Sequence, residues 1–175
     1  VELVKCFADA GVPKGVLNLV FGIPSEVSEH LIGSDIVKKI SFTGSVEVGR
    51  LLGRLAGERL KRITLELGGH APVLVMEDAS LDLVVAHRLG AKFFNAGQIC
   101  ASPTRFLVHE KLYERFVAAF SQGAAALRLG NGLDPQTQMG PLANGRRLTA
   151  MERLVADARA RGATIVTGGR RRGTD

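Results

Sequence analysis

Along most of this chain, the hydrophobic positions follow one of two periods. Short apolar runs bounded by turn residues predict strands, whereas apolar residues at every third or fourth position predict helices. The predicted strands are Gly15–Val20, Val37–Phe42, Ile63–Leu67, Ala71–Met76, Thr104–His109 and Ala163–Thr167. The helices predicted before residue 100 are Glu2–Ala10, Glu26–Ile32, Val46–Ala56 and a segment that Ser80 caps and that runs to about Phe94. This alternation predicts an α/β fold with a largely parallel sheet covered by helices.

Two later segments have the clearest helical spacing. The first apolar stripe is Tyr113, Phe116, Val117, Phe120, Ala124 and Leu127, and the second is Leu148, Met151, Leu154, Val155 and Ala158. We expect both stripes to pack into the core. Between them, Gly130–Gly145 is rich in Gly, Pro and Asn and predicts a long loop, which is either functional or a simple connector.

The chain has 175 residues, of which 46% are hydrophobic, enough to bury a sizeable core as one or two domains. It begins at Val1, and we expect it to be a piece of a longer protein. Cys6 and Cys100 lie far apart and no secretory leader is recognisable, which favours a reducing, cytoplasmic setting. No apolar run is long enough to cross a membrane.

A net charge of +6 and the run Arg170–Arg172 raise the question of nucleic-acid binding. The basic residues are spread through amphipathic segments, and no nucleic-acid-binding motif is present, so we expect no nucleic-acid partner. The four histidines include no pair at metal-ligand spacing, and we expect no metal site.

The segment ISFTGSVEVGR, Ile40 to Arg50, predicts a strand that turns through Gly44 into a helix capped by Ser45. A glycine turn permits close approach of the backbone, and the start of a helix favours a phosphate. The spacing departs from G-x-G-x-x-G, so the residues alone leave two interpretations open, a variant dinucleotide site or a structural turn.

The segment FFNAGQICAS, Phe93 to Ser102, places Cys100 just after a glycine-containing break in a helical pattern. Upstream, LELGG places the carboxylate of Glu66 directly before a Gly-Gly turn. Free cysteines are commonly buried and inert, and a carboxylate at a strand end is usually just exposed. Two reactive groups beside glycines nevertheless favour a single active site.

The motifs FTGSxxxG, ELGG and NAGQxC, in this order and at these separations, resemble the aldehyde dehydrogenase superfamily over essentially the whole chain. The closest likeness is to the succinate-semialdehyde dehydrogenase-like branch, through GHAPV after ELGG and through GNGL and MGPL. The resemblance implies a parallel-sheet α/β fold in which the end of a Rossmann-type cofactor domain precedes the start of the catalytic domain. The implied boundary lies near Leu67, giving domains 1–67 and 68–175.

The resemblance also implies a role for each reactive group. Cys100 would attack the aldehyde carbon, and the resulting thiohemiacetal would pass a hydride to the nicotinamide and leave a thioester. Glu66 would act as general base for the water that hydrolyses this thioester, and its Gly-Gly hinge would let it leave the hydride path. The backbone N–H of Cys100 would supply half of an oxyanion hole.

The implied cofactor is NAD or NADP. Residues that would contact it are Gly22, Gly44, Ser45, Val48, Gly49 and Leu67. Ser45 and the amides after Gly44 would lie at the pyrophosphate, Val48 near the adenine and Leu67 beside the nicotinamide. Gly49 would let the helix approach closely. Gly22 would line the adenine side, where Pro24 replaces a glycine of the family.

The implied substrate is a small-molecule aldehyde, with a semialdehyde as a candidate, and the implied full-length enzyme is a homodimer or homotetramer. The family's second oxyanion donor, its ribose-binding residues and its oligomerisation strands would lie outside this sequence. We therefore expect the chain alone to be inactive.

Three alternatives remain. A CoA-acylating dehydrogenase would transfer the acyl group to coenzyme A, although the hydrolytic role of Glu66 disfavours it. A cysteine hydrolase would use His70 to assist Cys100, but it would leave FTGSxxxG unexplained. A non-catalytic binding or structural fragment would leave Cys100 with ordinary thiol reactivity.

Overall fold

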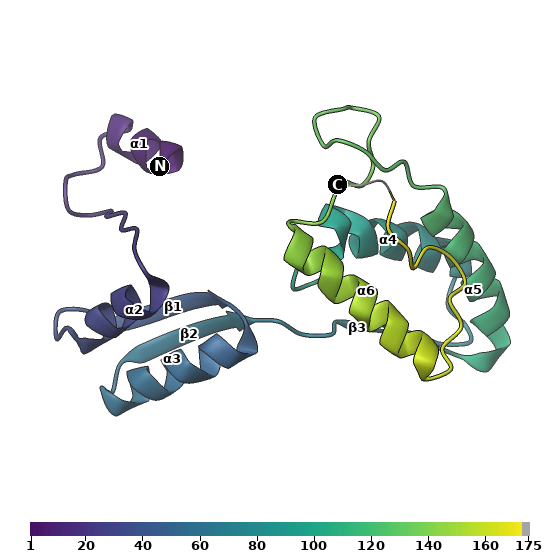
Figure 1. Cartoon of the computed structure of the whole chain (residues 1–175), viewed down its shortest axis with the longest axis horizontal. Helices are drawn as coiled ribbons and strands as arrows, with labels where there is room; N and C mark the ends of the chain where they lie inside the picture. Colours follow the sequence, from purple (N-terminus) through teal and green to yellow (C-terminus); the bar gives the residue numbers. More distant parts are fainter. Residues whose placement is uncertain (173–175) are drawn as a thin grey trace. The chain divides into compact units, whose positions relative to one another are not determined.

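The computed structural model describes residues 1–172, which form two compact units, Val1–Gly68 and the part from Gly69 onward (Figure 1). The predicted second domain, 68–175, ends in three residues that lie outside the described ones. Each unit contains its own two-stranded parallel sheet. The predicted fold class, a mixed α/β chain with parallel strands, is confirmed, although the described strands form two small sheets in place of one.

The first unit contains two parallel strands joined by a helical crossover. Its elements are α1 (Glu2–Asp9), α2 (Pro24–Gly33), β1 (Lys39–Gly44), α3 (Val46–Glu58) and β2 (Arg62–Leu67). The strands pair in register from Lys39 opposite Arg62 to Gly44 opposite Leu67. Helix α3 contacts both strands, as expected for a helix that connects two parallel strands.

The start of α2 and the buried face of α3 follow from their residues. Helix α2 begins at Pro24, whose fixed φ suits the first helical turn and whose missing N–H would have no acceptor within the helix. Helix α3 buries Leu52 and Ala56, which are four positions apart and therefore lie on one face. With Ile32 of α2, they form the core of this unit.

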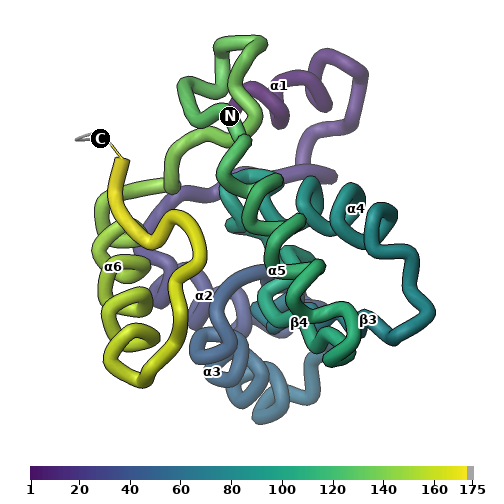
Figure 2. Tube along the Cα trace, turned by 90° about the vertical axis from the view of Figure 1, so that its right-hand side faces the viewer, coloured from purple at the N-terminus to yellow at the C-terminus, as the bar shows by residue number. Residues whose placement is uncertain are grey.

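The second unit places helices beside a second strand pair. Its elements are β3 (Pro72–Val75), α4 (Leu81–Phe93), the 3₁₀ segment η1 (Phe94–Gly97), β4 (Arg105–Val108), α5 (Glu110–Ala125) and α6 (Gly145–Ala160). Strands β3 and β4 are parallel, from Pro72 opposite Arg105 to Val75 opposite Val108. The connection between α5 and α6 is a long loop in both views (Figures 1 and 2), and an isolated β-bridge between Leu129 and Met139 closes its base.

Four phenylalanines link α4, β4 and α5. The ring of Phe120 lies 5.1 Å from that of Phe106, 5.3 Å from that of Phe116 and 6.4 Å from that of Phe93, measured between centroids. Such pairs add about 0.5–1.5 kcal/mol each beyond their area burial. Together with Val75 and Leu112, which are buried, this cluster forms the core of the second unit.

The prediction that both helical stripes pack into the core was only partly right. Phe116 is buried and Phe120 is half-buried, but Tyr113 is 52% exposed, while Leu112 is buried although the stripe omits it. On α6, Leu154 is 51% exposed and the other members of its stripe are half-buried. An apolar stripe shows which face a helix can bury, but burial also requires a neighbouring element over that whole face.

Two predicted strands were wrong. Gly15–Val20 forms turns and irregular backbone, with Val16 and Val20 exposed, and Ala163–Thr167 is irregular. A strand is stable only when a neighbour satisfies its backbone N–H and C=O groups. No strand of the described residues pairs with either segment, so an apolar run alone was an insufficient signal.

Candidate active site

The turn between β1 and α3 has the geometry of an anion-binding helix start. Ser45 is the N-cap residue of α3, and its Oγ accepts a hydrogen bond from the Val48 N–H at 3.3 Å. The cap predicted at Ser45 is therefore confirmed. The first N–H groups of a helix lack intrahelical acceptors, and together with the helix dipole they favour a phosphate.

Gly49 lets α3 lie directly against the end of β2. A Cβ on residue 49 would lie 2.6 Å from Cδ2 of Leu67, far inside van der Waals contact. Leu67 is in turn paired with Gly44, where a Cβ would overlap the ring of Phe42. Gly44, Ser45, Gly49 and Leu67 are therefore brought together at one end of the first sheet.

Two other residues predicted to contact the cofactor, Val48 and Gly22, lie outside this cluster of four residues. Val48 lies in the first turn of α3 and is 42% exposed. Gly22 lies in the irregular segment before α2, where a Cβ would lie 2.9 Å from Cγ2 of Val27. Space at Gly22 is therefore restricted by Val27 of the following helix α2, which accounts for a small residue there without a ligand.

Glu66 is exposed near the end of β2, opposite Thr43 of β1. Gly68 and Gly69 follow it, and a Cβ at either position would meet nothing within 4 Å. The division between the two units falls between these glycines. Glu66 therefore belongs to the first unit, whereas Cys100 belongs to the second.

Cys100 lies on an exposed turn after the break in α4, and its thiol is free. The helix ends at Phe93, and Asn95 and Ala96 then adopt left-handed backbone angles, with φ of 49° and 55°. Gly97 follows with φ of 75°. The glycine-containing break was predicted, but the left-handed conformation of two residues that carry a Cβ was not.

A buried contact closes the base of this turn. Ser102 is 1% exposed, and its Oγ donates a hydrogen bond to the carbonyl of Lys92 at 3.0 Å. The Lys92 Nζ lies 3.5 Å from the same Oγ, and burial lowers the pKa of this lysine. Sequence reasoning missed both residues, because neither has a motif or a spacing that distinguishes it.

His70 contacts Thr104. The Thr104 N–H donates to the His70 carbonyl at 3.3 Å, and the Thr104 Oγ1 lies 3.4 Å from His70 Nδ1. Among the described residues, His70 makes no hydrogen bond to Cys100. This arrangement gives no support to a cysteine hydrolase that depends on His70.

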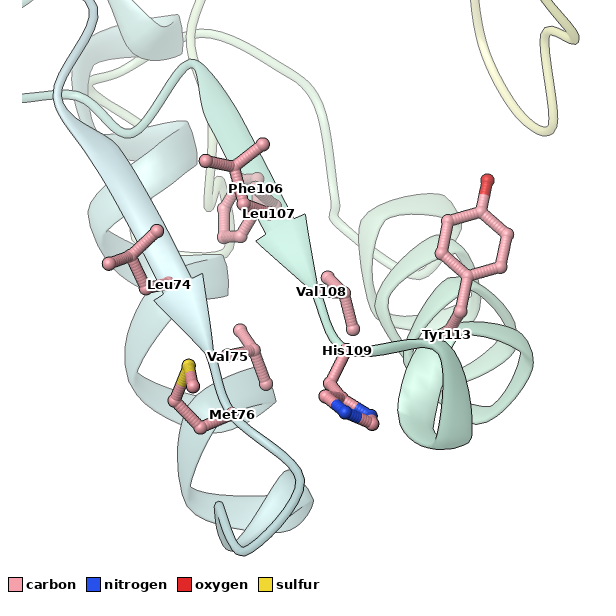
Figure 3. A pocket seen from close by; sticks show the side chains of 8 residues that line it. All are labelled: Leu74, Val75, Met76, Phe106, Leu107, Val108, His109 and Tyr113. Atoms are coloured by element: carbon pink, nitrogen blue, oxygen red, sulfur yellow. The ribbon is translucent and has the colours of Figure 1, made fainter.

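A concavity lies elsewhere, along β3 and β4 (Figure 3). Its volume is about 440 Å³, and its lining is Leu74, Val75, Met76, Phe106, Leu107, Val108, His109 and Tyr113. Leu74 and Leu107 are 66% and 53% exposed on this uncovered side of the sheet. The lining is almost wholly apolar and excludes both reactive residues, so it is not the candidate active site.

Within residues 1–172, no group of three or more His, Cys, Asp or Glu side chains is arranged to hold a metal ion. Over the same residues, no helix is both long enough and apolar enough to cross a membrane.

The model of the "Aldehyde dehydrogenase family" matches residues 1–175. The chain is 51% identical over 164 residues to 4-(hydroxymethyl)benzenesulfonate dehydrogenase of Comamonas testosteroni, which covers 94% of this chain and 34% of that protein.

Two solved structures are also similar. Succinate-semialdehyde dehydrogenase from Burkholderia pseudomallei has a TM-score of 0.93 and 40% identity, covering 97% of this chain and 35% of that one. Betaine aldehyde dehydrogenase from Staphylococcus aureus, solved with NAD+, has a TM-score of 0.91 and 35% identity, covering 99% and 34%. The chain thus spans about a third of the length of the relatives it matches.

Proposed function

Because the chain belongs to the aldehyde dehydrogenase family, we propose that it forms part of an enzyme that oxidises an aldehyde to a carboxylic acid with NAD or NADP. The observation that most directly supports this function is the exposed, free thiol of Cys100 on the turn that contains the NAGQxC motif. Relatives named as succinate-semialdehyde dehydrogenases support a semialdehyde as a candidate substrate.

Cys100 is the nucleophile in this proposal. Its thiolate attacks the aldehyde carbon, and the new C–S bond converts the carbonyl into a thiohemiacetal oxyanion. The backbone N–H of Cys100 donates to that oxyanion. When bound, NAD or NADP would supply the hydride acceptor, and the acyl group would then remain on the Cys100 sulfur as a thioester.

Glu66 is the general base for hydrolysis of the thioester. Its carboxylate takes a proton from water as the water oxygen attacks the acyl carbon, and Cys100 leaves as thiolate. Gly68 and Gly69, which follow Leu67, would provide the Gly-Gly hinge on which the carboxylate rotates.

The residues at the β1–α3 turn fit a dinucleotide. The helix start capped by Ser45 would hold the pyrophosphate, and the close contact at Gly49 leaves Leu67 at the strand end beside it. Val48 and Gly22 would line the adenine side. In this proposal, residues 1–67 belong to the cofactor-binding domain and residues 68–175 to the catalytic domain, in a full-length homodimer or homotetramer.

Substitution of the nucleophile tests this function in the full-length enzyme. We expect Cys100→Ala to abolish aldehyde-dependent formation of reduced cofactor, because no thioester can form. Cys6→Ala is the matched control, since Cys6 is also an exposed free cysteine and lies on α1. Assays of reduced cofactor should show normal turnover for the control. Turnover by Cys100→Ala at the rate of Cys6→Ala would refute the proposal.

A further inference from the structure

The backbone that leads to Cys100 needs external support. Asn95 and Ala96 have φ of 49° and 55° and ψ of 39° and 30°, which is left-handed helical geometry. A Cβ makes this geometry unfavourable, because it crowds the following carbonyl oxygen. Two such residues in succession persist only where neighbouring groups hold them.

Gln98 holds this turn from within. Its Nε2 donates a hydrogen bond to the Asn95 carbonyl at 3.1 Å, and its backbone N–H donates to the same oxygen at 3.1 Å. In return, the Asn95 Nδ2 donates to the Gln98 carbonyl at 3.4 Å. These bonds close the left-handed turn two residues before the thiol.

The oxygen of the Gln98 carboxamide contacts a segment of the second unit that is far away in the sequence. Its Oε1 accepts a hydrogen bond from the Ala143 N–H at 3.0 Å, a contact between residues 45 positions apart. Ala143 precedes Asn144, the N-cap of α6, whose Oδ1 accepts from the Arg147 N–H at 3.0 Å. The turn is thereby tied to the start of α6.

We propose that Gln98 is a positioning residue for Cys100, whose carboxamide holds the left-handed turn against the start of α6 and so places the thiol for attack. This inference rests on the proposed function of Cys100. A carboxamide suits the task because it donates and accepts at the same time. The Lys92–Ser102 contact closes the turn only onto α4, whereas Gln98 connects it to a separate element.

The test uses the full-length enzyme with three glutamine variants. Gln98→Met keeps a similar length but removes both hydrogen bonds, and Gln98→Glu keeps the acceptor for Ala143 but loses the donor for Asn95. Gln122→Met, at an exposed glutamine of α5, is the matched control. For each variant, we measure the rate at which the first turnover forms reduced cofactor, and the KM for the aldehyde.

We expect the first-turnover rate to fall about 10- to 100-fold in both Gln98 variants, because small misplacement of a reacting atom costs up to roughly that factor. KM and the temperature of unfolding should stay close to those of Gln122→Met. A purely structural role would instead lower the unfolding temperature and leave the first turnover of the folded fraction normal.

First-turnover rates equal to that of Gln122→Met would overturn the inference. If Gln98→Met does not fold, Gln98→Glu decides the question by the same comparison. Failure of the proposed function has a different signature, since Cys100→Ala would then retain turnover. Normal first turnover in the Gln98 variants of an enzyme that Cys100→Ala inactivates would overturn the positioning role alone.

Discussion

Glu66 and Cys100 bring different chemistry to the proposed reaction, one as a base and the other as a nucleophile. Both are exposed, and each follows from a short motif that contains glycine. If the two act in successive steps, variants of each should fail at different stages of a single turnover.

Glu66→Gln should therefore keep a rapid burst of reduced cofactor and lose steady turnover, because the neutral amide cannot accept the proton from the attacking water. A decrease of about 10²- to 10⁴-fold in the steady rate is typical of a lost general base. Rapid mixing of the full-length enzyme with aldehyde and cofactor measures both phases. Glu114→Gln, at an exposed carboxylate on α5, is the control. An unchanged steady rate in Glu66→Gln would exclude the role as base.

At the level of single residues, the sequence predicted interactions between residues that are close together in the chain. A serine directly before an apolar helical stripe predicted the cap at Ser45, since the cap bond spans only three residues. The bond from Gln98 to Ala143 spans 45 residues and has no local signature, so sequence patterns did not reveal it.

At the scale of elements, the packing of α3 on β2 depends on the absence of a side chain at Gly49. An ideal Cβ in Gly49→Ala would lie 2.6 Å from Cδ2 of Leu67, so the Leu67 side chain or the helix must shift, at a cost of up to about 1–3 kcal/mol. Gly53→Ala is the matched control on the same helix, because its Cβ would meet Leu65 Cδ1 at an ordinary 3.8 Å.

Helix propensity alone favours alanine over glycine by about 1 kcal/mol. We therefore expect Gly53→Ala to raise the free energy of unfolding and Gly49→Ala to lose that gain or to lower it. Denaturant unfolding of the two variants measures the difference. Equal stabilisation by both substitutions would show that α3 does not depend on close approach at Gly49.

The apolar pattern does not show whether a predicted strand has a neighbouring strand to pair with. Val37–Phe42 and Ile63–Leu67 correspond to β1 and β2, which pair with each other through the α3 crossover. Gly15–Val20 has a similar apolar run but no partner in the described residues, and Leu17 and Leu19 are exposed. An apolar run predicts a strand only as far as the fold supplies a neighbour for it.

At the scale of the whole molecule, the chain spans about a third of the length of the relatives it matches. We expect the 175-residue chain alone to give negligible aldehyde-dependent reduction of NAD or NADP, as measured against the full-length enzyme. Steady formation of reduced cofactor by the isolated chain would contradict this expectation.

The sequence by itself determined the α/β class, the helix start at Ser45, the glycine break before Cys100 and the family, because these depend on local periodicity and short ordered motifs. Only the tertiary structure decided which apolar runs pair as strands, which side of each helix is buried, and that Gln98 ties the Cys100 turn to α6. Those features depend on hydrogen bonds and packing between residues far apart in the chain, and such contacts produce no periodic pattern in the sequence.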